Sequence, residues 1–236
     1  MPKRLVELYS YPDLEEPKKR VNLRYSRSSG DILGYGSECL SVNRVYLDEK
    51  ANPYAFKQMT DLNRICQATE AEWFLRYAGI PVPPEFYSLR TVRRPDVQGI
   101  LMTDLTNNWR NLFINSNVTN YSQTTRRWSE ANPDLFQKFV DLKPNDPEVY
   151  GQLDFQAEQI AMQAAENDIL IHHADTVSVV MSEEGIEVMI TDMGHVYPYT
   201  NRPKNNLFTN NLELVSLGLI SFTDYHSRVV KHYKKR

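Results

Sequence analysis

The stretch IHHADTVSVVMSEEGIEVMITDMG, residues 171–194, decides the fold. It contains two β-branched runs, residues 177–181 and 186–191, joined by a polar segment that ends in Gly185. β-Branched residues are typical of strands, and a glycine can supply the positive φ that a tight turn requires. The stretch therefore predicts a β-hairpin with an aspartate close to each of its ends.

The two aspartates are candidates for different chemistry. Asp175 follows an apolar run and two histidines, and a carboxylate placed there could orient and deprotonate a hydroxyl group. Asp192 ends the second strand, and its oxygens are the hard donors that Mg²⁺ prefers. His172 and His173 suggest a zinc site, but adjacent residues of an extended segment point to opposite faces. Because no Cys or His recurs at ligand spacing, we do not expect zinc.

A glycine-containing motif lies nearer the N-terminus. Gly34, Tyr35, Gly36 and Ser37 stand between two candidate strands, and residues without Cβ let backbone N–H groups approach phosphate oxygens. The same Gly-x-Gly pattern is also typical of an ordinary tight hairpin. Cys39 occupies the position of a third glycine.

A lysine and two glutamates form the next candidate set. Lys57 ends an apolar strand, where its ammonium group could reach into a cleft or simply extend to solvent. Glu70 and Glu72 follow on a helix expected over residues 60–78, and either could pair with Lys57. We favour Glu70 because of its distance from the turn that begins at Gly79.

The remaining pattern gives the organisation of the chain. Residues 1–30 are rich in charged residues and predict an extended or loosely docked arm. Residues 31–105 predict a sheet that carries one helix, and the Asn-rich residues 106–132 predict a linker with one or two short helices. Apolar residues at helical spacing predict helices over residues 150–166 and 212–222.

Composition limits the possible functions. The chain has 236 residues, of which 41% are hydrophobic, and a net charge of -3, which argues against a broadly basic nucleic-acid-binding surface. Two cysteines, Cys39 and Cys66, are too few for a disulfide framework. We see no membrane-spanning run or cleavable signal and expect no membrane partner. The expected location is the cytoplasm, or a host cell reached by a route without a signal.

The order of these features resembles the protein-kinase-like superfamily over residues 31–225. The resemblance implies an α+β, two-lobed protein-kinase-like fold, with an N-lobe at residues 31–105 and a truncated C-lobe at residues 106–236. It also implies ATP and Mg²⁺ as cofactors. In that scheme Asp175 is the catalytic aspartate and Asp192 the metal ligand.

By the same resemblance, Lys57 is the strand lysine and Glu70 its helix partner. Met102 looks like the residue that guards the adenine pocket, and Thr103 and Leu105 belong to a hinge whose backbone would hydrogen-bond adenine. The chain departs from the pattern at Val180, where an asparagine would hold a second Mg²⁺. It departs again at Val177, where a lysine often supports the transferring phosphate; Ser178 is one neighbour that could substitute.

The segment after Asp192 is short and contains no Ala-Pro-Glu motif, a feature similar to the compact effector kinases that bacteria deliver by type III secretion. The leading interpretation is a monomeric Ser/Thr kinase that acts on a protein substrate. Val180 and Cys39 favour a pseudokinase that binds a partner without transferring phosphate. Residues 79–83, GIPVP, leave open a small-molecule phosphotransferase of the aminoglycoside type.

Overall fold

The computed structural model describes residues 4–25, 32–36, 39–47, 53–93, 97–105, 111–114, 126, 129–130, 133–143, 146–182, 185–199 and 204–235, with the backbone alone for 32–36, 111–114 and 204–205. The chain divides into two compact units. The first unit comprises residues 1–73 and 83–104, and the second comprises residues 74–82 and 105–236.

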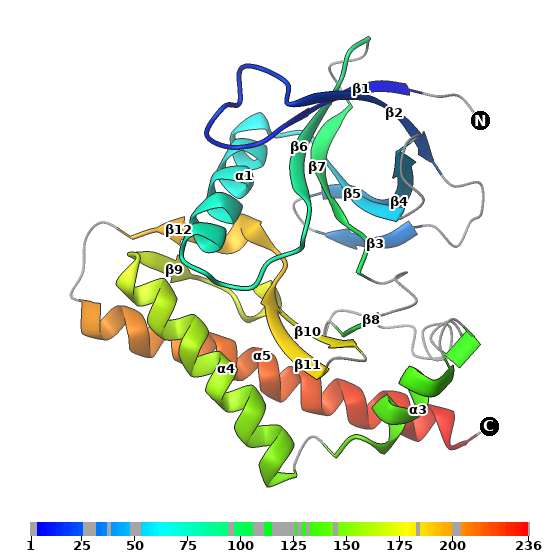
Figure 1. The fold of residues 1–236 in the computed structure, drawn as a ribbon, viewed down its shortest axis with the longest axis vertical. Coiled ribbons are helices and arrows are strands. Elements are labelled where there is room, and N and C mark those ends of the chain that lie inside the picture. Colours follow the sequence, from blue (N-terminus) through cyan, green and yellow to red (C-terminus); the bar gives the residue numbers. More distant parts are fainter. Residues whose placement is uncertain are drawn as a thin grey trace. The chain divides into compact units, whose positions relative to one another are not determined.

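The first unit is built on an antiparallel sheet of seven strands. These are β1 (Arg4–Tyr9), β2 (Lys19–Tyr25), β3 (Ile32–Gly36), β4 (Cys39–Leu47), β5 (Pro53–Met59), β6 (Phe86–Thr91) and β7 (Gln98–Thr103). Their order is β2-β1-β6-β7-β5-β4-β3, and β2 also pairs with β4. Every strand except β3 therefore belongs to a closed six-stranded barrel, to which β3 is attached through β4 (Figure 1).

Strand β4 closes the barrel because the two halves of one edge have different partners. Its first half pairs irregularly with β3, whereas residues 45–47 pair with residues 23–25 of β2. The opposite edge of β4 pairs with β5. The N-terminal strands β1 and β2 thus bridge β6 on one side and β4 on the other.

An extended or loosely docked arm was predicted over residues 1–30, and for the described residues 4–25 this prediction is wrong, because residues 4–9 and 19–25 are strands of the barrel. Val6 and Leu8 on β1, and Val21 and Leu23 on β2, are each no more than 5% exposed and belong to the barrel core. Burying an aliphatic side chain stabilises a fold by about 1.5–3 kcal/mol. These apolar residues alternate with polar or charged ones, so the composition alone resembles that of a solvated tail.

Helix α1 (Leu62–Tyr77) confirms the helix expected over residues 60–78. It begins after Asp61, whose carboxylate accepts hydrogen bonds from the N–H groups of Asn63 at 2.9 Å and Arg64 at 3.4 Å. It ends at Tyr77, two residues before Gly79, whose φ of +76° is the left-handed conformation that commonly stops a helix.

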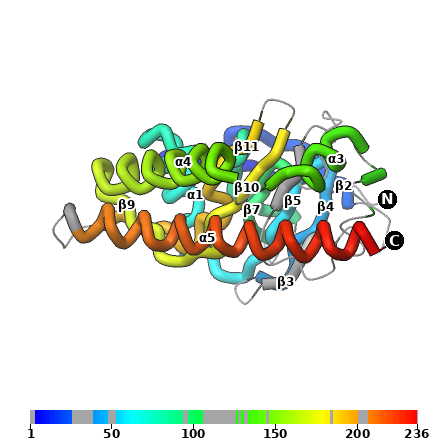
Figure 2. Tube along the Cα trace, turned by 90° about the horizontal axis from the view of Figure 1, so that it is seen from below, coloured from blue at the N-terminus to red at the C-terminus, as the bar shows by residue number. Residues whose placement is uncertain are grey.

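The described part of the second unit combines helices with short strands. The helices are α3 (Pro133–Asp141), α4 (Pro147–Glu166) and α5 (Lys204–Tyr233). The strands are β8 (Asn111–Ile114), β9 (Ile169–Ile171), β10 (Val177–Ser182), β11 (Gly185–Ile190) and β12 (Val196–Pro198), with 3-10 turns η2 (Ala174–Thr176) and η3 (Met193–His195). Strands β11, β10 and β8 form one sheet, and β12 pairs with β9 in another. Figure 2 shows α4 and α5 packed side by side along this unit.

Strands β10 and β11 confirm the predicted hairpin, and Gly185 has the expected positive φ, at +143°. Helix α4 confirms the prediction over residues 150–166. Helix α5 is much longer than the predicted residues 212–222, because its buried stripe continues to Val229 and includes two polar residues, Asn211 and His226.

The segment interpreted as a linker, residues 106–132, lies largely outside the described residues. Within it, β8 adds a strand to the hairpin by pairing with β10. Among the described residues, no helix is both long and apolar enough to cross a membrane.

Candidate functional site

The β10–β11 hairpin brings the predicted catalytic aspartate, Asp175, and the predicted metal ligand, Asp192, to the same end. Asp175 is the middle residue of η2, which ends where β10 begins. Asp192 follows β11 and caps η3. Between them, the Thr191 N–H donates a hydrogen bond to the Thr176 carbonyl oxygen at 2.8 Å. Two carboxylates that are distant in sequence therefore flank one backbone hydrogen bond.

Asp192 is fixed by the turn that it begins. Its Oδ1 accepts a hydrogen bond from the Gly194 N–H at 3.2 Å, and the Gly194 carbonyl oxygen accepts one from the Tyr197 hydroxyl at 3.0 Å. The next side chain, Met193, is 1% exposed and anchors the turn in the core. An oriented, half-buried carboxylate fits the preference of Mg²⁺ for hard oxygen donors.

Asp175 is partly accessible to solvent. Its side chain is 44% exposed, and Oδ2 lies 3.4 Å from Nδ1 of His173. The His173 ring packs 5.2 Å from that of His195, whereas the His172 ring lies 6.1 Å from that of Tyr197. A substrate hydroxyl can therefore approach the Asp175 carboxylate, as general-base chemistry requires.

Val180 lies in an apolar environment. It pairs with Glu187 in the hairpin register, and its side chain is 5% exposed in a cluster with Leu105 and Met189. Ser178, the neighbour considered as a substitute ligand, is 1% exposed, and its hydroxyl lies 2.7 Å from that of Thr191. The hairpin therefore offers no metal-binding oxygen at Val180.

Two residues of α5 that sequence reasoning missed support the segment that carries Asp175. The buried side chain of Asn211 accepts a hydrogen bond from the Ile171 N–H and donates one to the Ile169 carbonyl oxygen, both at 2.9 Å. Seven residues later, on the same helix face, an added Cβ at Gly218 would lie 2.7 Å from Cβ of Val177. A glycine within a helix lowers the stability of the helix by about 1 kcal/mol relative to alanine. A glycine in a predicted helix was therefore the one feature of the sequence that could have indicated close packing at this position.

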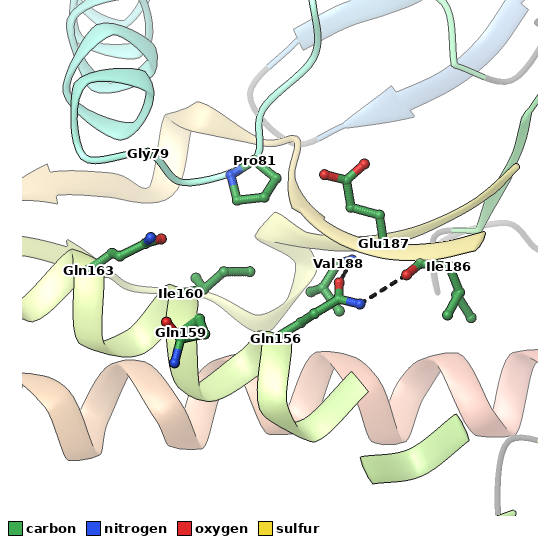
Figure 3. A pocket seen from close by; sticks show the side chains of 9 residues that line it. All are labelled: Gly79, Pro81, Gln156, Gln159, Ile160, Gln163, Ile186, Glu187 and Val188. Carbon is green, nitrogen blue, oxygen red and sulfur yellow. Dashed lines mark hydrogen bonds between the residues drawn. The ribbon is translucent and has the colours of Figure 1, made fainter. Parts of the chain in front are cut away.

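The second unit also contains a pocket of about 390 Å³ between α4 and β11 (Figure 3). Gln156 forms part of its wall: its amide nitrogen donates to the Ile186 carbonyl oxygen at 2.9 Å, and its amide oxygen accepts from the Val188 N–H at 2.7 Å. This amide therefore satisfies backbone groups on the outer edge of β11. Glu187 also lines the pocket, and burial raises the pKa of its carboxyl group.

In the first unit, Lys57 lies on strand β5, between β7 and β4. It pairs with Val42 of β4 and Ile100 of β7, and it is half-buried. Gly99 on β7 is another residue that sequence reasoning missed. An added Cβ there would collide with the Lys57 carbonyl oxygen and approach the Phe56 ring to 2.9 Å, so this glycine lets β7 pass close to β5.

The two α1 glutamates face different surroundings. Glu72 is 7% exposed and lies on the buried face with Ile65 and Leu75. Glu70 is half-buried and accepts a hydrogen bond from the Tyr11 hydroxyl. Of the two glutamates, Glu72 is therefore the more buried, and a buried carboxylate requires a partner. The predicted pairing of Glu70 with Lys57 stays a prediction.

The predicted phosphate-binding glycines lie at the barrel edge. Gly34, Tyr35 and Gly36 belong to β3, whose pairing with β4 shifts register at both glycines. Only the backbone is described for these residues, and Ser37 lies outside the described residues. Their contact with phosphate stays a prediction.

The predicted hinge residues follow β7. Met102 and Thr103 are its last two residues, and the Thr103 hydroxyl accepts a hydrogen bond from the Glu85 N–H at 3.1 Å. Asp104 is 1% exposed and forms an ion pair with Arg44, in which Arg44 Nε lies 2.6 Å from Asp104 Oδ2. No pattern in the sequence predicted this ion pair. Leu105 is the first residue of the longer of the two segments that form the second unit, residues 105–236.

No protein-family model and no curated protein matches the sequence. Among solved structures, ROP2 from Toxoplasma gondii is similar, with a TM-score of 0.50 and 11% sequence identity over 94% of this chain and 67% of that protein. ROP2 is a virulence factor with a protein-kinase fold and no enzymatic activity. The chain therefore has a protein-kinase-like fold, the coarser part of the sequence-based expectation.

Proposed function

We propose that this protein binds ATP and Mg²⁺ and transfers the γ-phosphoryl group to a Ser or Thr hydroxyl of a protein substrate. The observation that carries the proposal is the hairpin end that presents Asp175 and Asp192 together. In this proposal the two compact units correspond to two lobes.

The proposed roles follow from the surroundings of each residue. Asp192 would hold Mg²⁺, which when bound neutralises phosphate charge and orients the phosphates. Asp175, which is exposed beside His173, would orient the substrate hydroxyl and accept its proton. Lys57 would contact the α- and β-phosphates, with Glu72 in place of Glu70 as its partner.

The nucleotide would be held by backbone as well as by charge. The N–H groups of residues 34–37 would approach the phosphates, and Met102, Thr103 and Leu105 would border the adenine. Thr103 supports this role because its hydroxyl, rather than its carbonyl oxygen, accepts the Glu85 N–H. Since Val180 is packed among apolar side chains, we infer a site with one metal ion.

The second candidate function is a pseudokinase that binds nucleotide or a partner without phosphoryl transfer. The buried Val180 favours it, because the residue removes the second metal ligand of the kinase pattern. The lack of activity of ROP2, which shares the fold, is compatible with this candidate.

Labelled ATP and Mg²⁺, added with a protein extract as substrate, distinguish the two candidates. We expect label transfer by the wild-type chain and a loss of roughly 10²–10³-fold in Asp192→Ala and Lys57→Ala, because each removes charge stabilisation of the transferring phosphate. Glu158→Gln and Lys138→Ala remove exposed charges on α4 and α3 and should retain activity. ATP binding without transfer under any divalent metal would identify the pseudokinase instead.

A further inference from the structure

The N-terminal hairpin, defined here as residues 4–25, contains a loop between β1 and β2 that contacts helix α1. The Tyr11 ring lies 5.2 Å from the Trp73 ring, with an angle of 51° between their planes. The Tyr11 hydroxyl also donates a hydrogen bond to Glu70. Burial and the charge of Glu70 raise the pKa of Tyr11, so the hydroxyl keeps its proton and remains a donor.

Tyr11 binds a helix face that differs from the buried one. Glu70 and Trp73 are three residues apart and are therefore neighbours on the surface of α1. Residues two apart on a helix differ in direction by about 200°, so Glu72 points away from Glu70. The contacts of Tyr11 with Glu70 and Trp73 therefore leave Glu72 on the buried face of α1, where it is 7% exposed.

The loop is anchored in the barrel that carries Lys57. Strand β1 pairs with β6, β2 pairs with β4, and β4 pairs directly with β5 at Lys57. At the start of the loop, Tyr9 donates a hydrogen bond to Glu7 at 2.7 Å, and its ring lies 4.9 Å from the Arg90 guanidinium carbon. Tyr11 is thus held at a fixed place relative to the barrel strands.

We propose that Tyr11 is a positioning residue, which fixes the rotation of α1 through Trp73 and Glu70 so that Glu72 stays available to Lys57 in the nucleotide site. This inference rests on the proposed nucleotide-binding function. It gives residues 4–25 a role in keeping the site permanently assembled, without modification of a loop elsewhere.

The test uses the full chain and two variants of graded effect. Tyr11→Phe removes the hydrogen bond and keeps the ring on Trp73, whereas Tyr11→Ala removes both contacts. Tyr77→Ala is the control, since it removes a tyrosine of the same helix that is 76% exposed. The measurements are the Kd for ATP with Mg²⁺, amide hydrogen exchange over residues 62–77, and the midpoint of urea unfolding.

We expect Tyr11→Phe to raise the Kd about fivefold, the typical effect of losing one hydrogen bond, and Tyr11→Ala to raise it further. Exchange over residues 62–77 should become faster in the same order. For Tyr11→Phe the unfolding midpoint should stay close to the wild-type value, because the barrel core is intact. A purely structural role would instead move the midpoint and leave the Kd unchanged.

Unchanged Kd and unchanged exchange in both Tyr11 variants would overturn the proposal, as would equal effects in Tyr77→Ala. If the wild-type chain binds no nucleotide, the proposed function fails, and hydrogen exchange decides the positioning role alone. Faster exchange over residues 62–77 in the Tyr11 variants than in the wild-type chain then supports the positioning of α1 by Tyr11. Exchange at the wild-type rate overturns it. If Tyr11→Ala does not fold, Tyr11→Phe decides both measurements.

Discussion

At the scale of single residues, the closest packing beside Asp175 is at Gly218. An added Cβ would lie 2.7 Å from Cβ of Val177 and 3.3 Å from the Ala174 carbonyl oxygen, both in the segment around Asp175. The substitution Gly218→Ala improves helix propensity by about 1 kcal/mol, but forcing a methyl into a packed site costs about 1–3 kcal/mol. Since the contacting atoms belong to a Cβ and to backbone, we expect overpacking to dominate.

Gly218→Ala should therefore lower the free energy of unfolding in urea and reduce phosphoryl transfer more than ATP affinity. Gly151→Ala on α4 is the matched control, because nothing lies within 4 Å of its added Cβ. That control should be more stable than the wild-type chain by about 0.5–1 kcal/mol. Equal stability gains in the two variants would show that α5 does not press on the segment around Asp175.

At the scale of elements, the hairpin register determines what Val180 can do. Val180 is opposite Glu187, in the strand interior, whereas Asp192 lies beyond the hairpin end. Introducing the asparagine of the kinase pattern, Val180→Asn, would place an amide in the cluster with Leu105 and Met189. We expect it to lower the free energy of unfolding by about 1–3 kcal/mol, the cost of a buried polar group without a partner.

The same variant should not increase phosphoryl transfer, because its amide would lie inside the apolar cluster. Urea unfolding and the ATP assay test both expectations. Val92→Asn is the control, since Val92 is 45% exposed and such surface changes alter stability by no more than about 0.5 kcal/mol. A stable, more active Val180→Asn protein would contradict the packing argument and support a two-metal site.

Elements defined by local sequence were predictable, and those defined by distant partners were not. The hairpin is specified by two β-branched runs and Gly185, all within one short window, and the places of Asp175 and Asp192 at its end follow from it. Strand β1, by contrast, pairs with β6 far along the chain, and no local pattern reveals that pairing. The choice between Glu70 and Glu72 also depended on Tyr11, which belongs to that unpredicted hairpin.

At the scale of the whole molecule, stability should depend on pH through His226. This residue of α5 is 5% exposed, and its Nε2 lies 2.7 Å from the Phe139 carbonyl oxygen on α3, so the neutral ring donates a hydrogen bond there. Its ring also packs 4.7 Å from the Phe139 ring. Burial lowers the pKa of His226, the nearby charge of Lys234 adds to this effect, and the hydrogen bond to Phe139 opposes it.

A histidine with a lowered pKa binds its proton more readily when the chain unfolds. Its contribution to stability is therefore complete above the unfolded pKa of about 6.5 and is lost as the pH falls below that value. His226→Gln retains a donor for the Phe139 carbonyl oxygen and cannot titrate, so the stability advantage of the wild-type chain over this variant should shrink from pH 7 toward pH 5. Urea unfolding at several pH values measures this difference, from which other titrating groups cancel if they act alike in both proteins. Parallel curves for the two proteins would mean that the pKa of His226 is the same in the folded and unfolded chains. His226 would then contribute nothing to the pH dependence of stability.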